Sequence, residues 1–139
     1  MNSPSDSSLN LTLTDLPVPS SQVEDRLALI ARILDAVGRE LTEPCLVHDT
    51  EMGPVVVSLD AARVIGRSVR ADYPGPTCAD LSLSGRHCRV EPTPDGMLLE
   101  DLQSTNGTWI DTRRVETRLL RAGDLVRIGR QRFVYFDPQ

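Results

Sequence analysis

The sequence predicts an all-β sandwich of about 11 short strands, preceded by one α-helix and a disordered N-terminal tail. From Cys45 onward, short runs of aliphatic and β-branched residues alternate with turn signals such as Gly53-Pro54 and Pro94-Asp95-Gly96. The chain has 139 residues, which suits one domain with an appendage. Aromatic residues make up only 4% of the chain, so the core of that domain must be mainly aliphatic.

The tail is expected over residues 1–20, which are rich in Ser, Pro, Asn, Thr and Asp. These residues offer too little apolar surface to offset the entropy lost on ordering, so we expect disorder. Within the tail, residues 9–16 alternate apolar and polar side chains, a pattern typical of a short linear motif or of a strand that pairs with a sheet edge.

An amphipathic helix is expected over residues 21–42, with Ser21 as its N-cap and Glu24 completing a capping box. Its apolar seam consists of Val23, Leu27, Ile30, Leu34, Val37 and Leu41, with Leu29, Ile33 and Ala36 widening it. Two interpretations of this face stay open: docking on the chain's own sandwich, or homo-oligomerisation of residues 21–41 as a short coiled coil or helical bundle. Pro44 prevents the helix from continuing.

The sandwich itself is expected over residues 44–137, where turn signals separate the strand-like runs. The expected strands are residues 45–48, 55–59, 63–65, 80–83, 88–91, 97–101, 109–110, 118–120, 124–128 and 132–136.

Charge argues against a nucleic-acid partner. The formal net charge is −5, of which residues 1–43 carry −4 and residues 44–139 carry −1. Non-specific nucleic-acid binding needs a basic footprint, which this balance does not supply. All 15 basic residues are arginines, so guanidinium is the only strong cationic donor that the chain can offer to an anion.

The cysteines indicate a reduced compartment. Cys45, Cys78 and Cys88 are odd in number and contain no C-x-x-C pair, so neither a disulfide framework nor a metal site is expected. No apolar run approaches membrane-spanning length, and no motif indicates a cofactor. We therefore expect a soluble, cytoplasmic protein without a membrane partner.

Three short segments, each beside strand-like runs, carry the chemistry: Gly66-Arg67, Ser84-Gly85-Arg86-His87 and Thr105-Asn106-Gly107. Arg67 supplies a cation, Ser84 and Thr105 supply hydroxyl groups, and the Gly85 backbone supplies an amide donor. The Asn106 side chain has both an amide donor and a carbonyl acceptor. Together these groups suit a phosphate dianion, which offers three strong acceptor oxygens, and the peptide that carries it.

The order and spacing of these segments resemble the forkhead-associated (FHA) domain, a reader of phosphothreonine peptides. The resemblance runs from about Pro44 to Asp137 and includes the G-R, S-x-x-H and N-G elements. It implies a SMAD/FHA-like sandwich in which Asn106 pairs with the peptide main chain on both sides of the phosphothreonine. Gly85 stands where a larger residue is common, and Asp111-Thr112 stands where Asn-Gly is typical.

Three further residues are expected to support the site. Gly66 allows a tight turn at a strand end, His87 braces the loops through hydrogen bonds, and Gly107 gives the backbone room. We do not expect Ser84 and His87 to form a catalytic dyad, because no nucleophile elbow and no orienting third residue accompany them. An enzyme is therefore not expected.

The sequence thus predicts a phosphothreonine-dependent adaptor that binds phosphorylated proteins in a Ser/Thr protein kinase pathway. The alternative is a structural module that mediates phosphate-independent assembly or oligomerisation of a larger regulatory or secretion complex. The intact Arg67, Ser84 and Asn106 favour the first, because a module without phosphate dependence has no need of them.

The tail itself could be a ligand. Thr12 lies three residues before Asp15, a spacing that some FHA domains favour, and Thr14 is a second threonine in the same short segment. A phosphorylated tail would engage the pocket in cis or in trans. A chance spacing in a tail of simple composition is the more economical interpretation.

Overall fold

The computed structural model describes residues 20–68, 72 and 80–138, and the side chains from residue 25 onward. Two helical elements come first, α1 (Ser20–Val37) and the 3₁₀ turn η2 (Gly38–Glu40). The strands that follow are β1 (Cys45–Thr50), β2 (Gly53–Ser58), β3 (Arg63–Ile65), β4 (Cys88–Thr93), β5 (Gly96–Asp101), β6 (Thr108–Ile110), β7 (Arg113–Val115), β8 (Thr117–Leu119), β9 (Leu125–Ile128) and β10 (Gln131–Phe136). Residues 1–19 of the predicted tail, with Thr12 and Thr14, lie outside the described residues, and Ser20, its last predicted residue, belongs to α1.

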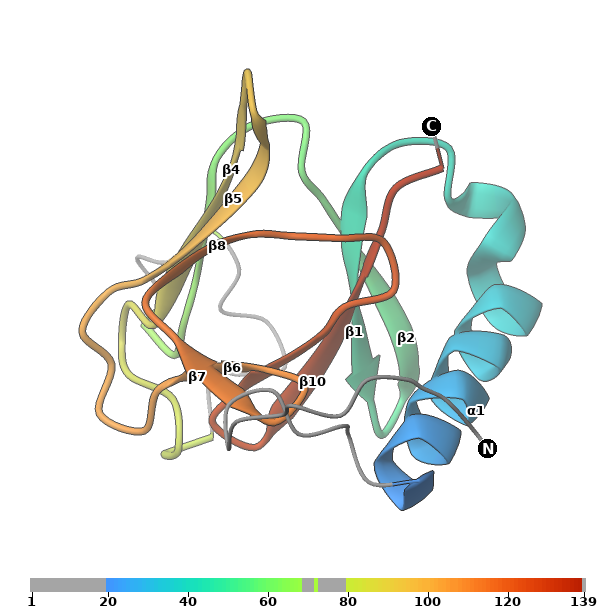
Figure 1. Cartoon of the computed structure of the whole chain (residues 1–139), viewed down its shortest axis with the longest axis horizontal. Coiled ribbons are helices and arrows are strands. Elements are labelled where there is room, and N and C mark those ends of the chain that lie inside the picture. Colours follow the sequence, from blue (N-terminus) through green and yellow to red (C-terminus); the bar gives the residue numbers. More distant parts are fainter. Residues whose placement is uncertain (1–19, 69–71, 73–79, 139) are drawn as a thin grey trace, which may run out of the picture.

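The strands form two antiparallel sheets, which confirms the predicted all-β sandwich (Figure 1). The larger sheet has six strands in the order β2-β1-β10-β9-β6-β7, and the smaller has four in the order β3-β4-β5-β8. The described residues form ten strands, against the predicted eleven or so.

Two segments depart from the predicted strands. Residues 80–83, expected as a strand, form a turn in which the Leu83 amide donates to the Asp80 carbonyl at 3.1 Å. The Asp80 carboxylate also accepts the Ser82 amide at 2.8 Å, and this side-chain bond competes with strand pairing. Conversely, β7 was not predicted, because Arg113 and Arg114 are exposed and its short sequence shows no apolar alternation.

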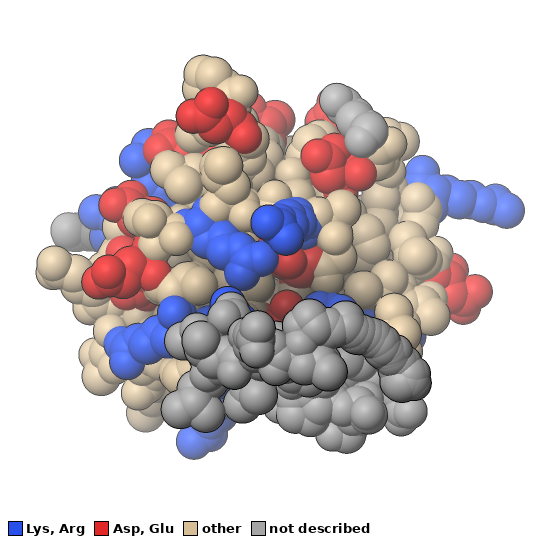
Figure 2. All heavy atoms as spheres, viewed as in Figure 1, with Lys and Arg blue, Asp and Glu red and all other residues tan. Residues whose placement is uncertain are grey.

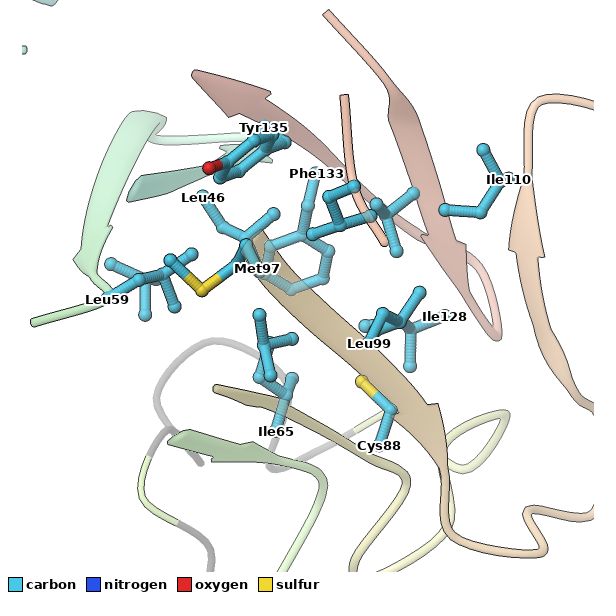
Figure 3. Close-up of a cluster of buried hydrophobic side chains, with 14 of the residues drawn as sticks. Leu46, Leu59, Ile65, Cys88, Met97, Leu99, Ile110, Ile128, Phe133 and Tyr135 are labelled. Atoms are coloured by element: carbon cyan, nitrogen blue, oxygen red, sulfur yellow. The ribbon is translucent and has the colours of Figure 1, made fainter. Parts of the chain in front are cut away.

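The core lies between the two sheets, where side chains from both inner faces point toward one another (Figure 3). It is mainly aliphatic, as the composition predicts, with Phe133 as its largest fully buried side chain. Alternate residues of each strand supply it, so β9 contributes Val126 and Ile128 while Arg127 between them faces solvent.

The helix α1 docks on the outer face of the six-stranded sheet, which is the first of the two interpretations above. Leu29 and Ile33 are 3% and 0% exposed and pack with Val47 and Val134 of the sheet. No helix in the described part of the chain is long and apolar enough to cross a bilayer.

The bounds and the buried face of α1 differ from the prediction. The helix begins at Ser20, so Ser21 lies inside its first turn instead of capping it, and regular helix ends at Val37, short of residue 42. Leu27 and Leu34 of the predicted seam are 57% and 48% exposed. The buried face is therefore centred on Leu29 and Ile33, which the prediction placed at its margin.

We predict that Ile33→Ala lowers the free energy of unfolding by about 2–5 kcal/mol, because the substitution empties a fully buried site between α1 and the sheet. The matched control is Leu34→Ala, one residue further along α1, which should change it by about 1 kcal/mol or less. Urea denaturation followed by circular dichroism measures both. An equal loss in the two variants would contradict the docked position of α1.

Candidate functional site

The three segments singled out by sequence meet at one end of the sandwich. Residues 66–68 follow β3, residues 82–87 precede β4, and residues 102–107 join β5 to β6. The first two segments are linked by backbone hydrogen bonds from the Arg67 amide to the Ser84 carbonyl at 3.0 Å and from the Ser68 amide to the Gly85 carbonyl at 2.9 Å. In Figure 1 the loops before β4 and before β6 lie at the lower left, away from α1.

His87 joins the second and third segments. Its Nδ1 accepts the Ser84 amide hydrogen at 3.0 Å, so the proton of the neutral ring lies on Nε2, which donates to the Gly107 carbonyl at 2.7 Å. The ring is fully buried. Burial lowers the pKa of His87 below its ordinary value, although the Gly107 hydrogen bond and the charge of Asp101 oppose this shift. The neutral ring thus fixes the distance between the two loops.

Ser84 and Thr105 lie side by side at the surface. The Ser84 Oγ accepts the Thr105 backbone amide hydrogen at 3.0 Å. The Ser84 hydroxyl keeps its own proton, which it can donate to an anion. The Thr105 side chain is exposed beside it, so two hydroxyl groups occupy adjoining positions on two loops.

Asn106 is exposed and held from both sides. Its Nδ2 donates to the Ser82 carbonyl at 2.8 Å, and its backbone carbonyl accepts the Trp109 Nε1 hydrogen at 3.1 Å. These bonds leave the Oδ1 acceptor and one Nδ2 hydrogen for a ligand. The side chain can therefore offer a donor and an acceptor at once.

Arg67 is half-buried and anchored at its inner nitrogen. Its Nε donates to the Leu83 carbonyl at 3.1 Å. Among the residues that the structure describes, neither terminal guanidinium nitrogen has an acceptor and no carboxylate neutralises the charge. A guanidinium held by one edge is suited to an oxyanion at the other. Arg86, on the neighbouring loop, adds a second, exposed cation near the site, for which the sequence predicts no role.

Two glycines are needed for different reasons. A Cβ at Gly66 would overlap the Gly85 carbonyl oxygen, so close approach of the two loops, and not the predicted tight turn, requires glycine there. Gly107 has φ +85°, which favours glycine, and the Arg114 side chain lies over it. Gly85 is under no such restraint, since a Cβ there would lie 3.5 Å from the nearest atom, Ser68 Cβ.

Asp101 braces the loop before β6 and was missed by sequence reasoning. Its carboxylate accepts the Ser104 hydroxyl at 2.5 Å and the Thr108 hydroxyl at 2.7 Å, and Ser104 Oγ accepts the Gly107 amide at 3.0 Å. Burial would raise the pKa of Asp101, but these donors outweigh it and hold the pKa below its ordinary value. The Asp-x-x-Ser spacing of a side-chain turn is the signal that could have identified it.

A second buried histidine supports the loop of Ser82, whose carbonyl accepts the hydrogen bond from the Asn106 side chain. His48, fully buried and stacked on Phe133, bonds through Nε2 to Gln131 Oε1 at 2.7 Å. The Gln131 side-chain amide donates to Asp80, whose carboxylate accepts the Ser82 hydroxyl at 2.6 Å. No sequence signal could identify this network, because its members are brought together only by the fold.

The described residues hold no cluster of three or more His, Cys, Asp or Glu side chains that could bind a metal ion. Cys45 and Cys88 are free and buried. Burial raises the pKa of Cys45 to about 11 and raises that of Cys88 further, so both thiols stay protonated at neutral pH. Cys78 lies outside the described residues.

A family model and similar proteins point to the same family. The family model described as FHA domain matches residues 63–129. FhaB of Mycolicibacterium smegmatis, an FHA domain-containing protein, is 31% identical over 127 residues, which are 88% of this chain and 80% of FhaB. The ABC transporter ATP-binding/permease protein Rv1747 of Mycobacterium tuberculosis is 37% identical over 73 residues. That match spans 52% of this chain but only 8% of the transporter.

Solved structures show the same fold. The FhaA FHA domain, crystallised in complex with the intracellular domain of Rv3910, superposes with a TM-score of 0.59 at 30% identity. The match covers 67% of this chain and 99% of that one. A second structure, from a study of phosphothreonine-dependent FHA domain interactions, superposes with a TM-score of 0.61 at 28% identity. This second match covers 70% of this chain and 99% of the chain in that structure.

We predict that Gly66→Ala destabilises the fold or distorts the loops, because the new methyl group must displace the Gly85 carbonyl. Overpacking of this kind costs about 1–3 kcal/mol. Gly85→Ala is the matched control, since its methyl group meets only an ordinary contact. Thermal unfolding of both variants measures the difference. A Gly66→Ala variant as stable as Gly85→Ala would contradict the close approach of the two loops.

Proposed function

This chain belongs to the FHA domain family, and we propose that it is a phosphothreonine-dependent interaction module that binds phosphorylated proteins in Ser/Thr kinase signalling. The observation that carries the proposal is the meeting of Arg67, Ser84 and Asn106 on loops joined by hydrogen bonds. The relatives add support: one similar structure comes from work on phosphothreonine-dependent interactions, and another holds an FHA domain bound to an intracellular domain.

Each group has a distinct part in the proposed complex. The Arg67 guanidinium and the Ser84 hydroxyl bind the phosphate, and the Gly85 amide and Thr105 hydroxyl add neutral donors. Asn106 pairs with the peptide main chain, using the donor and acceptor that its contacts with Ser82 leave available. The site is therefore selective for a phosphate on a peptide, because both parts of the ligand have partners.

The magnitudes suit a reversible switch. Charge-assisted hydrogen bonds contribute about 1.5–3 kcal/mol each. Three or four of them, less the cost of ordering a flexible peptide, give micromolar binding, about −8 kcal/mol. An unphosphorylated peptide loses most of these bonds, so phosphorylation decides whether the complex forms.

The remaining features favour a binding module over other classes. Figure 2 shows basic and acidic side chains interspersed on the displayed face, a distribution that favours a protein partner over nucleic acid. Burial of both described thiols and the bracing role of His87 favour binding without catalysis. We place the module in the cytoplasm, because the similar FhaA FHA domain binds an intracellular domain and both described thiols are free.

A phosphate-independent assembly module is the less favoured function. It would leave the partly unoccupied donors of Arg67 and Asn106 without a purpose. The exposed Leu27 and Leu34 of α1 are compatible with self-association, but most of the apolar face of α1 is already packed against the chain's own sheet.

We predict that Arg67→Ala and Ser84→Ala each weaken binding of a phosphothreonine peptide at least 30-fold, since each removes a charge-assisted bond worth about 2 kcal/mol or more. The peptide would come from a degenerate phosphothreonine library pull-down with a dephosphorylated control. Isothermal titration calorimetry measures the affinity, and Arg121→Ala, which removes an exposed arginine elsewhere, is the matched control. Full affinity in the Arg67 variant, with unchanged circular dichroism, would overturn the assigned pocket.

A further inference from the structure

A row of cross-strand residues runs over the six-stranded sheet. Arg114 of β7 pairs with Trp109 of β6, Trp109 pairs with Arg127 of β9, and Arg127 pairs with Arg132 of β10. We call these four residues the arginine row. Since neighbouring strands lie about 4.8 Å apart, the three steps from Arg114 to Arg132 span roughly 14 Å.

The arginine row lies on the outer face of the sheet, just beyond the part that α1 covers. Side chains alternate along a strand, so Arg127 shares a face with Leu125, and Arg132 shares a face with Val134. Leu125 and Val134 pack against α1. The arginine row therefore lies on the same outer face, beside the residues that α1 covers, and its Arg114 and Arg127 are exposed. In Figure 1 these strands lead from the β7 side toward α1.

The cations of the row are incompletely neutralised. Arg127 lies over the Trp109 ring at 5.1 Å, and within the described residues neither Arg127 nor Arg114 has a carboxylate partner. Arg132 bonds to Asp49, but Arg32 shares that carboxylate at 3.0 Å. The residues described around the row therefore leave an excess of positive charge.

A cleft of about 360 Å³ extends the row beneath α1 and is lined by Asp25, Arg26, Asp111, Thr112, Leu125, Arg127 and Arg132. One of its two acids, Asp111, is paired with Arg26 at 2.9 Å. The hollow gives an extended segment a place to lie against Arg127 and Arg132.

The arginine row is continuous with the phosphopeptide site. The Trp109 indole donates to the backbone carbonyl of Asn106, and the Arg114 side chain lies over Gly107, the next residue. A peptide that leaves Asn106 in this direction meets Trp109 and Arg114 first, and then Arg127.

We propose that the arginine row binds an acidic segment of the same partner protein, adjoining the phosphothreonine that the pocket holds. The proposal rests on the proposed function and adds to it the chemistry of the flanking sequence. An extended chain advances about 3.3 Å per residue, so four or five residues cover the row. Complementary charge at such a rim favours association and selects among phosphorylated partners.

The test compares five phosphothreonine peptides that share one core, determined by the library selection. They are the core alone, the core with four glutamates at its N-terminal or its C-terminal end, and the core with four lysines at its N-terminal or its C-terminal end. Exposed ion pairs are individually weak, so we expect the glutamates, at one end only, to raise affinity about tenfold at low salt. The lysines at that end should lower affinity, and 0.5 M NaCl should remove both effects.

The protein variant Arg114→Gln/Arg127→Gln should lose the tenfold gain and keep the affinity for the core peptide within about twofold. Arg39→Gln/Arg121→Gln removes the same charge from exposed sites outside the row and should keep the gain. Because Trp109 is the only tryptophan, acrylamide quenching of its fluorescence reports directly on the row. The glutamate-extended peptide should protect it more than the core peptide does.

The outcomes separate the two proposals. If the core peptide binds but the glutamate extension gives no gain at either end, the arginine row is not a binding surface and the pocket assignment stands. A gain in affinity from the glutamates that persists in Arg114→Gln/Arg127→Gln would also show that the arginine row does not bind the acidic segment. If no phosphorylated peptide binds, the proposed function fails, and this inference fails with it.

Discussion

The neutral imidazole of His87 is the interaction on which the binding end of this molecule depends. One ring nitrogen accepts a hydrogen bond from the loop of Ser84, and the other donates to the loop of Asn106 through the Gly107 carbonyl. Protonation would turn the acceptor into a second donor facing the Ser84 amide, so the ring can hold both loops only while neutral. Full burial keeps it neutral, because a charged ring is costly away from water.

The remaining contacts maintain the arrangement that His87 sets. Gly66 lets the Arg67 loop approach the Gly85 carbonyl, and Asp101 fixes the loop before β6 through Ser104 and Thr108. The sandwich core anchors the strands from which all three loops emerge, while α1 packs on the far part of the larger sheet. A rigid scaffold thus presents a cation, hydroxyl groups and an amide at positions fixed before any ligand arrives.

Much of this could be predicted because the signals are local. Turn residues such as Pro94-Asp95-Gly96 separate the strands, and the three site segments contain their own turn and donor residues. Most of the unpredicted features depend on distant parts of the chain. The network from Asp80 through Gln131 to His48 joins residues far apart in sequence. The turn at residues 80–83 is a local exception, because it forms where Asp80 bonds to Ser82, two residues further on. The arginine row exists only through strand register, and the sheet beneath α1 decides that Ile33 is buried while Leu34 is exposed.

The bridge between the two loops is tested by the protonation state of His87, read by two-dimensional ¹H–¹⁵N NMR of the imidazole nitrogens across pH 5 to 8. Assignment uses a His48→Gln variant, which leaves His87 as the only histidine. We expect a neutral ring with its proton on Nε2 throughout the neutral range, and a pKa below the ordinary value. A proton on Nδ1, or a charged ring at pH 7, would contradict the bridge between the two loops and the preformed site that rests on it.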